Sequence, residues 1–458
     1  MRILTGTEVL SPQGGLEVCV FEDAIALADA GHDVTLLYTR DGSQRPFFER
    51  AGVRLWGPVR FLFDPRRAVK DLARFVRSAL RTRRLGVDVL WLNRPENIIW
   101  AQVVSRLARV PLVVHLHHAP NYRWERLLMR GVAHSIAVSD YMKTVWTDAG
   151  VPADRISVVS NALPAGKYRP ATPAQNAAAR ERLGVTGDAR VVLYYGRITR
   201  NKGVLTALEA WKTLGLDPSR AVLVLAGNRV GAGSDDDQAI GEALEALQPG
   251  SVVRLPNQDD VSWLLHAADL VVAPSWEPES FGRTVVEAFS AGLPAIGSDL
   301  GGAHDILSGP LERFSVPSRD SGALAAKIES LLDWRVAEPA LGRVVTCEVA
   351  RRFSYDDHLA GIVRILEAAA GGGRARGRRS PVGNSGDGVA PAPSDAPDAP
   401  VSGVAAALAD ERAAAAAGDE RAAAGDERPA RASRPLDSVP AALRDSALRQ
   451  TRTSVTIR

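Results

Sequence analysis

Two glutamates, Glu279 and Glu287, are the residues whose type and spacing most directly suggest chemistry. They lie in PSWEPESFGRTVVEAFSAGLPAIGSDLGG, residues 274–302, where an apolar strand is followed by a loop and then by a helix expected to begin near Phe281. The spacing puts Glu279 in the loop and Glu287 about two turns into the helix. Free backbone N–H groups at the helix start, from Phe281 to Thr284, can hold a phosphate, and a carboxylate in the helix can accept two hydrogen bonds from a ribose diol. The alternative is that Glu279 caps the helix and Glu287 faces solvent.

Two basic residues, Arg197 and Lys202, follow another apolar strand in YYGRITRNKG, residues 194–203. In an open α/β sheet, ligands bind beyond the carboxyl ends of the strands, so both cations are expected to reach the same crevice as the two glutamates. Together they can neutralise a diphosphate, and arginine can do so with two parallel hydrogen bonds. The alternative is that each is an ordinary solvated cation, but their place beside Gly196 and Gly203 favours binding.

A glycine pair, Gly14 and Gly15, comes directly after the first expected strand and before a helix. Glycine lets the backbone approach a phosphate closely. Such a pair alone is typical of an ordinary turn, and only its position between strand and helix favours a binding role.

Three segments, in order along the chain, resemble the motifs of glycosyltransferase family 4. Residues 11–39, SPQGGLEVCVFEDAIALADAGHDVTLLYT, are similar to the glycine-rich opening loop, first helix and second strand of that family. Residues 194–203 resemble its Gly-Arg and Lys-Gly motif, and residues 274–302 resemble its Glu-x₇-Glu signature. The resemblance covers nearly all of residues 1–370. It implies a retaining enzyme with the GT-B fold, in which two Rossmann-like, doubly wound domains face a cleft and no metal or other cofactor is needed.

The resemblance also implies roles for individual residues. The catalytic set that it implies is His117, Glu279, Arg197 and Lys202. The donor-binding set is Gly14, Gly15, Arg197, Lys202, Glu279, Phe281, Gly282 and Glu287. The nucleotide and diphosphate are expected to rest mainly on the second domain, with His117 and Gly15 approaching from the first. No metal ligands are predicted.

His117 is one of three histidines in PLVVHLHHAPN, with His115 and His118. Imidazoles are common metal ligands, but alternate residues of a strand share a face, His118 points away, and no cysteine or carboxylate lies close in sequence. The family places a histidine at the end of this strand, near the donor sugar, and His117 matches it best. The role of His115 stays open, and a purely structural role for all three is the alternative.

Three aspartates could also be taken for ligands. Asp235 and Asp237 form an Asp-x-Asp pair, a metal-binding pattern in other glycosyltransferases, but they open a helix after a glycine-rich loop. There, Ser and Asp side chains cap free N–H groups, and capping is the favoured interpretation. Asp305, in DLGGAHDILSG, stands where the family usually has a glutamate near the donor, so its shorter side chain leaves a direct contact open.

Short apolar runs alternate with helical patterns over about 350 residues, which predicts an α/β protein with parallel sheets. The first set of expected strands is Arg2–Thr5, Asp33–Thr39, Val53–Trp56, Asp88–Asn93, Pro111–His117, Ser135–Ser139 and Ile156–Asn161. The second set is Val191–Gly196, Ala221–Gly227, Ser251–Leu255, Leu270–Ser275 and Pro294–Ser298. We interpret residues 1–165 as an acceptor-side domain and 166–370 as a donor-side domain, whose last helix can pack back on the first domain. Residues 371–458 are low-complexity and lack aromatics, which predicts a disordered tail.

The 458-residue chain has a formal net charge of +3, so overall charge gives no case for nucleic-acid binding. Its cysteines, Cys19 and Cys347, are expected to be buried or incidental thiols, as in a reducing cytoplasm. No signal peptide is predicted, and no apolar run reaches the roughly 18 to 20 residues of a membrane-spanning helix. We therefore expect a cytoplasmic protein, with peripheral membrane association left open.

One segment, residues 63–84, keeps the membrane in consideration. Its apolar residues follow helical spacing and are Val69, Leu72, Ala73, Val76, Ala79 and Leu80. Its basic residues are expected on another face and are Arg66, Lys70, Arg74, Arg77 and Arg81. The segment is either an ordinary amphipathic helix with a solvated basic face or a helix that docks onto anionic lipid.

The function that these patterns predict is transfer of a sugar from a nucleotide-diphosphate sugar to a carbohydrate or lipid-linked acceptor, in cell-envelope polysaccharide or glycolipid synthesis. One alternative is another GT-B enzyme, such as a nucleotide-sugar epimerase, which needs no acceptor. A second is a catalytically silent scaffold of an envelope-polysaccharide complex, which the presence of Arg197, Lys202 and Glu279 disfavours.

Overall fold

The computed structural model describes residues 1–377, apart from 121–124, 186 and 229–232. Within these residues the strands form two parallel sheets, in the orders β3-β2-β1-β4-β5-β6-β7 and β10-β9-β8-β11-β12-β13. The first sheet comprises β1 Arg2–Val9, β2 Asp33–Arg40, β3 Arg54–Trp56, β4 Val89–Leu92, β5 Leu112–Leu116, β6 His134–Ala137 and β7 Ile156–Val158. The second comprises β8 Arg190–Tyr195, β9 Ala221–Ala226, β10 Val252–Leu255, β11 Leu270–Ala273, β12 Ala295–Ser298 and β13 Ser315–Val316. The predicted α/β class with two doubly wound sheets is confirmed, while β13 was not predicted.

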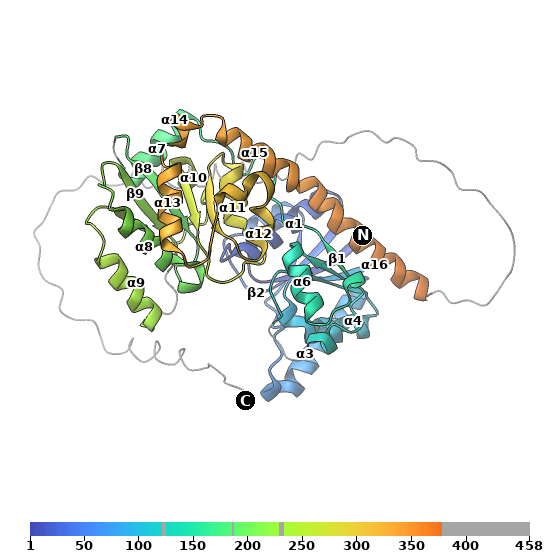
Figure 1. The fold of residues 1–458 in the computed structure, drawn as a ribbon. Helices are drawn as coiled ribbons and strands as arrows, with labels where there is room; N and C mark the ends of the chain where they lie inside the picture. Colours follow the sequence, from blue (N-terminus) through green and yellow to red (C-terminus); the bar gives the residue numbers. More distant parts are fainter. Residues whose placement is uncertain (121–124, 186, 229–232, 378–458) are drawn as a thin grey trace, which may run out of the picture. The chain divides into compact units, whose positions relative to one another are not determined.

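Helices alternate with the strands in both sheets, as parallel pairing requires. Those that follow strands of the first sheet are α1 Gly15–Asp29, α2 Arg45–Arg50, α3 Ala68–Leu85, α4 Ile98–Ala108, α5 Glu125–Leu128 and α6 Asp140–Asp148. The others are α7 Pro173–Leu183, α8 Val204–Leu214, α9 Asp235–Glu245, α10 Ser262–Ala267, α11 Arg283–Ser290, α12 Gly302–Ile306, α13 Ser321–Leu331, α14 Trp334–Ala337, α15 Leu341–Arg352 and α16 Tyr355–Gly377. Helices α8 and α13 pack against each other, and α13 also contacts β12 and β13; Figure 1 shows α8 and α13 as neighbours. Among the described residues, no helix has both the length and the apolar character needed to cross a membrane.

The last helix, α16, packs against the first sheet rather than the second. Its buried residues Tyr355, Ile362 and Leu366 belong to one apolar core with Val20 and Ile25 of α1. It continues to Gly377, so the first residues of the expected tail are helical. The rest of that tail, residues 378–458, lies outside the described residues.

A buried ion pair joins α16 to α1. His358 is 4% exposed, and its Nε2 lies 3.1 Å from Oδ1 of Asp23, while its Nδ1 lies 2.8 Å from the carbonyl oxygen of Ser160. Burial alone would lower the pKa of His358, but Asp23 and the Ser160 carbonyl outweigh burial and raise it. A raised histidine pKa means that the pair stabilises the fold fully below the ordinary value near 6.5 and less as pH rises through the folded-state pKa.

His358→Gln is therefore expected to lower the melting temperature more at acidic than at alkaline pH, because only the charged imidazole gains from Asp23. Thermal melts of both proteins between about pH 5.5 and 9.5 would measure this difference, with the ordinary histidine pKa of about 6.5 inside the range. A gap between the two melting curves that stays constant with pH would contradict the charged pair.

Helix α3 leaves its main apolar ridge exposed, with Val69 at 85%, Leu72 at 42%, Val76 at 41% and Leu80 at 53%. The buried face is a neighbouring ridge made by Asp71, Phe75, Ser78, Ala79 and Thr82. Two of the basic side chains also contact the rest of the fold. Arg74 lies 3.3 Å from buried Asp71, and the guanidinium of Arg81 lies 4.3 Å from the ring centre of Trp56.

The two cysteines differ in exposure. Cys19 of α1 is buried and Cys347 of α15 is exposed. Burial raises the pKa of Cys19 to about 12, which keeps its thiol neutral.

Candidate active site

A cavity of about 650 Å³ lies where loops that follow strands of both sheets meet. The predicted site residues that line it are Gly15, His117, Arg197, Lys202, Glu279, Phe281 and Gly282. Gly14 and Glu287 do not line it. Gly14 is the residue before α1, and its neighbour Gly15 begins that helix without a side-chain cap, so the N–H groups of the first turn are free to bind an anion.

Glu279 and Lys202 form an ion pair at the wall of the cavity. The Lys202 Nζ lies 2.9 Å from Oε2 of Glu279, whose Oε1 accepts a hydrogen bond from the hydroxyl of Ser275. Burial alone would raise the pKa of Glu279, but Lys202, Ser275 and Arg197 outweigh burial and lower it. Glu279 is thus an ionised carboxylate paired with a cation. It does not cap α11, because the residue before that helix is Gly282, without a side-chain cap.

The loop that carries the two cations is held by one hydroxyl. Tyr194 of β8 donates from Oη to the backbone carbonyls of Arg197, at 3.0 Å, and Lys202, at 3.1 Å. Both ends of the loop are therefore fixed to the buried strand. The Arg197 side chain is exposed, lines the cavity and makes no ion pair within the described residues.

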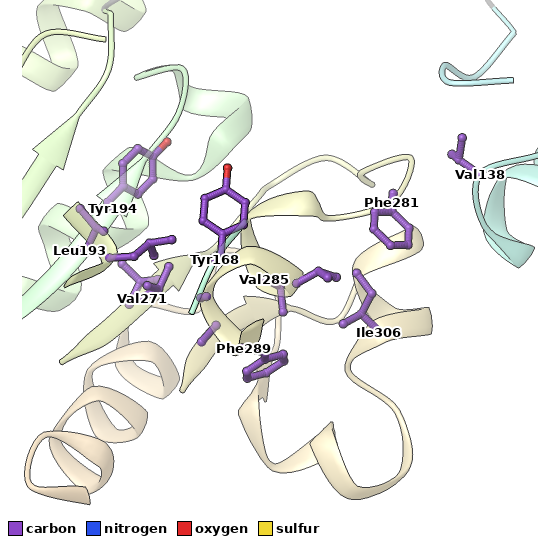
Figure 2. Packing of buried hydrophobic residues seen from close by; sticks show 14 of the residues in the cluster. Val138, Tyr168, Leu193, Tyr194, Val271, Phe281, Val285, Phe289 and Ile306 are labelled. Atoms are coloured by element: carbon purple, nitrogen blue, oxygen red, sulfur yellow. The ribbon is translucent and has the colours of Figure 1, made fainter. Parts of the chain in front are cut away.

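Phe281 and Gly282 shape the turn into α11, which begins at Arg283, two residues later than expected. Figure 2 shows Phe281 near Ile306, with Val285 and Phe289 projecting from α11. Gly282 has φ of 106°, which favours glycine, and a Cβ there would lie 3.2 Å from Cδ1 of Ile306, so the space beside it is also tight.

Glu287 is buried at 6% exposure, so the alternative in which it faces solvent is excluded. Its Oε2 accepts from the Tyr195 hydroxyl at 2.7 Å, and its Oε1 accepts from Nε of Arg283 at 2.6 Å. A carboxylate has about four lone-pair sites, so each oxygen keeps one for a further donor.

Arg283 lines the cavity and was missed by sequence reasoning. Its Nη1 and Nη2 donate to the two carboxylate oxygens of Glu22 in α1 at 2.8 Å each, and Nη1 lies 3.3 Å from Sγ of Cys19. Glu22 also accepts from Nζ of Lys167 at 2.6 Å. Burial alone would raise the pKa of Glu22, but Arg283 and Lys167 outweigh burial and lower it. The signal in the sequence is the adjacent acid pair, Glu22 and Asp23, inside an otherwise apolar helix.

The histidines occupy two environments, as the strand pattern predicted. His115 and His117 are buried with ring centres 4.0 Å apart, whereas His118 is exposed. Burial lowers the pKa of His117 well below its ordinary value, and His118, His358 and Arg94 lower it further. Its imidazole is thus neutral, and Nε2 has no hydrogen-bond partner within the described part of the chain. His117 lines the cavity, and a neutral imidazole there can hydrogen-bond a ligand.

The three aspartates are placed as follows. Helix α9 begins at Asp235 after the N-cap Ser234, whose hydroxyl accepts from the N–H of Asp237 at 3.2 Å, while Oδ2 of Asp237 accepts from the N–H of Gly233 at 3.1 Å. Asp305 does not line the cavity; its Oδ2 accepts from the N–H of Tyr141 at 3.0 Å. The described residues hold no cluster of three His, Cys, Asp or Glu side chains suited to a metal ion.

Two parallel α/β sheets with a cavity where their loops meet are the arrangement of the GT-B fold. The crystal structure of Anabaena HepE in complex with UDP-glucose has this fold, with a TM-score of 0.70 at 23% identity, over 80% of this chain and 100% of HepE. The model of Glycosyltransferase Family 4 matches residues 13–165, and that of Glycosyl transferases group 1 matches residues 175–340. The chain belongs to glycosyltransferase family 4, and the resemblance noted in the sequence is confirmed.

Two curated relatives illustrate the range of the family. The D-inositol 3-phosphate glycosyltransferase of Thermobispora bispora is 32% identical over 399 residues, 78% of this chain and 90% of the relative. The lipopolysaccharide 1,2-N-acetylglucosaminetransferase of Salmonella typhimurium is 28% identical over 269 residues, 56% of this chain and 68% of the relative. Both are sugar transferases with different acceptors.

Proposed function

We propose that this enzyme transfers a sugar from a UDP-sugar to an acceptor of cell-envelope polysaccharide or glycolipid synthesis, with retention of the anomeric configuration. The observation that carries the proposal is the meeting of Arg197, Lys202 and Glu279 in one cavity with the uncapped start of α1 at Gly15. Positive charge and free N–H groups at one point fit a diphosphate. UDP-glucose bound to the similarly folded HepE supports the choice of donor.

In the proposed reaction, the bond between the anomeric carbon and the diphosphate oxygen breaks, and a bond to the acceptor oxygen forms on the same face. The acceptor proton passes to the departing phosphate oxygen. Arg197 and Lys202 stabilise the negative charge on that leaving group. Glu279, ionised beside Lys202, stabilises positive charge on the sugar ring, and the neutral imidazole of His117 holds a sugar hydroxyl. Phe281 and Gly282 shape the backbone around the donor, and Gly14 precedes the lining residue Gly15. Glu287, which is held by the lining residue Arg283, binds the ribose of the donor.

The test is a screen of UDP-, GDP- and ADP-sugars by thermal shift, followed by NMR analysis of the product anomer. A donor present at about 100 times its Kd stabilises the fold by about 2.7 kcal/mol, so the correct nucleotide is identified by its melting shift. An inverted product would contradict retention. Conversion of the donor sugar without any acceptor would identify an epimerase instead.

Transfer is expected to continue in EDTA at an unchanged rate, because Arg197 and Lys202 supply the positive charge that a metal would otherwise bring. The measurement is the initial rate with and without chelator, before and after addition of Mn²⁺ or Mg²⁺. Activity lost in EDTA and restored by either ion would overturn this expectation and return Asp235 and Asp237 as candidate ligands.

Peripheral membrane association is part of the proposal, because the outer surface of α3 combines apolar and basic side chains. The exposed ridge of Val69, Leu72, Val76 and Leu80 lies beside exposed Lys70, Arg77 and Arg84, and the one acid of α3, Asp71, is buried. Such a surface fits anionic lipid, into which the ridge inserts while the cations remain at the headgroups. A lipid-linked acceptor would be presented at the same surface.

Reversing Lys70, Arg77 and Arg84 to glutamate is expected to weaken binding to vesicles of phosphatidylglycerol and phosphatidylcholine by about 100-fold, since each basic residue contributes about 1 kcal/mol near an anionic surface. Vesicle co-sedimentation measures the loss, which should be larger at low salt. Val344→Ser on α15, where the side chain is 51% exposed, is the matched control for a surface substitution and should bind normally. Equal binding of the triple variant would leave α3 as a plain solvated helix.

A further inference from the structure

One guanidinium joins the two halves of the enzyme through buried charges. Arg283 at the start of α11 makes a two-pronged pair with Glu22 of α1, and its third nitrogen, Nε, donates to Glu287. The side chains of Glu22 and Arg283 are 1% and 11% exposed. Lys167, in the segment between the two sheets, adds a second cation on Glu22. The cluster therefore links a helix of the first sheet to a carboxylate of the second.

We propose that Arg283 is a positioning residue that makes the orientation of Glu287, and with it the affinity for the nucleoside part of the donor, depend on Glu22 of the other half. The inference rests on the proposed function, because it takes Glu287 as the ribose ligand. It goes beyond the proposed function because it gives Glu22, which does not line the cavity, an indirect role in donor binding.

The geometry explains why an arginine is needed. A guanidinium presents its N–H groups in a rigid fork, so that one end binds Glu22 while the Nε side binds Glu287. The other oxygen of Glu287 is held by the Tyr195 hydroxyl, so both oxygens are fixed in direction. The charges of this buried cluster balance, because Arg283 and Lys167 are positive while Glu22 and Glu287 are negative. Removing any one of these charges leaves an opposite charge without compensation.

Reciprocity follows from this arrangement. If contact with Glu22 orients Glu287 for the donor, then donor bound to Glu287 must in turn favour the contact between α1 and α11. Donor binding and the approach of the two halves are thereby coupled through Arg283.

A double-mutant cycle tests the coupling, with Kd for UDP measured by calorimetry. Glu287→Gln alone is expected to weaken UDP binding about 10-fold, as the loss of a charged hydrogen-bonding group does. Glu22→Gln is expected to weaken it about 10-fold in the wild-type background but less than about 2-fold in the Glu287→Gln background. Asp23→Asn is the matched control, because it removes the neighbouring buried acid of α1, which pairs with His358 of α16 instead. It should leave Kd within about 2-fold in both backgrounds.

The outcomes separate the inference from the proposed function. If Glu287→Gln leaves the Kd for UDP unchanged, the ribose assignment fails and the inference with it. Only the inference is overturned if Glu287→Gln weakens UDP binding while Glu22→Gln has no effect on the Kd. The same holds if Glu22→Gln weakens binding by the same factor in the wild-type and Glu287→Gln backgrounds. Should the Glu22→Gln protein fail to fold, Arg283→Lys takes its place in the test, because lysine keeps the positive charge but lacks the planar guanidinium that binds both carboxylates. It is expected to raise KM for the donor about 10-fold with kcat nearly unchanged, and an unchanged KM would refute the positioning role.

Discussion

Arg197→Ala and Lys202→Ala are each expected to lower kcat by about 10²–10³-fold, the loss seen when one charge-stabilising group is removed from an active site. Both residues line the cavity, and the loop between them is anchored at both ends by the Tyr194 hydroxyl, so alanine should remove charge without moving the backbone. Lys202→Ala also leaves the partly buried Glu279 without its cation. Release of nucleoside diphosphate in a coupled assay measures the rates.

The matched control is Lys212→Ala, which removes an exposed cation of α8 well along the helix from this loop. It should leave the rate unchanged. Near-wild-type turnover in both active-site variants would exclude the assignment of Arg197 and Lys202 to the diphosphate.

Gly203→Ala is expected to destabilise the second half of the enzyme by about 3 kcal/mol or more and to abolish transfer. Gly203 has φ of +73°, and a Cβ at that position would lie 1.7 Å from the carbonyl oxygen of Pro274. A backbone atom cannot yield as a flexible side chain can. The loop carrying Lys202 must therefore move away from the strand end that precedes Glu279, and the ion pair between them is lost.

Gly215→Ala provides the comparison, because Gly215 ends α8 with φ of +55°, and a Cβ at that position would have no heavy atom within 4 Å. Only the left-handed backbone penalises alanine there, by about 1–2 kcal/mol. Melting temperatures of the two variants should differ accordingly, and activity should survive at Gly215. Equal melting shifts would show that the close approach to Pro274 is relieved at little cost.

The strands could be predicted from the sequence because fully buried strands of a parallel sheet are apolar along their length. Ala221–Gly227 was expected and β9 spans Ala221–Ala226; Val191–Gly196 was expected and β8 spans Arg190–Tyr195. The same logic misses β13, because Ser315–Val316 is too short for any periodicity to show. The cavity residues followed from their places at strand ends, where both sheets direct their loops.

The orientation of α3 and the charges around Arg283 could not be predicted in this way. Helical spacing identifies an apolar ridge but not which of two neighbouring ridges the protein covers, and in α3 it covers the ridge of Phe75 and Ala79. The partner of Arg283 is Glu22, 261 positions away, so no local pattern connects them. A buried acidic residue in an apolar helix indicates only that a positively charged side chain from another part of the chain must pair with it.

The return of α16 to the first sheet fixes the order in which the enzyme can be completed during synthesis. All seven strands of the first sheet leave the ribosome before α16 exists, yet Ile362 and Leu366 belong to the core that those strands and α1 share. Until they arrive, the apolar surface that α16 covers is open to water and to other nascent chains. An amino-terminal fragment ending at residue 165 lacks part of its own interior. In chain order, the whole second sheet is therefore inserted between β7, the last strand of the first sheet, and α16, the helix that completes the core of the first sheet.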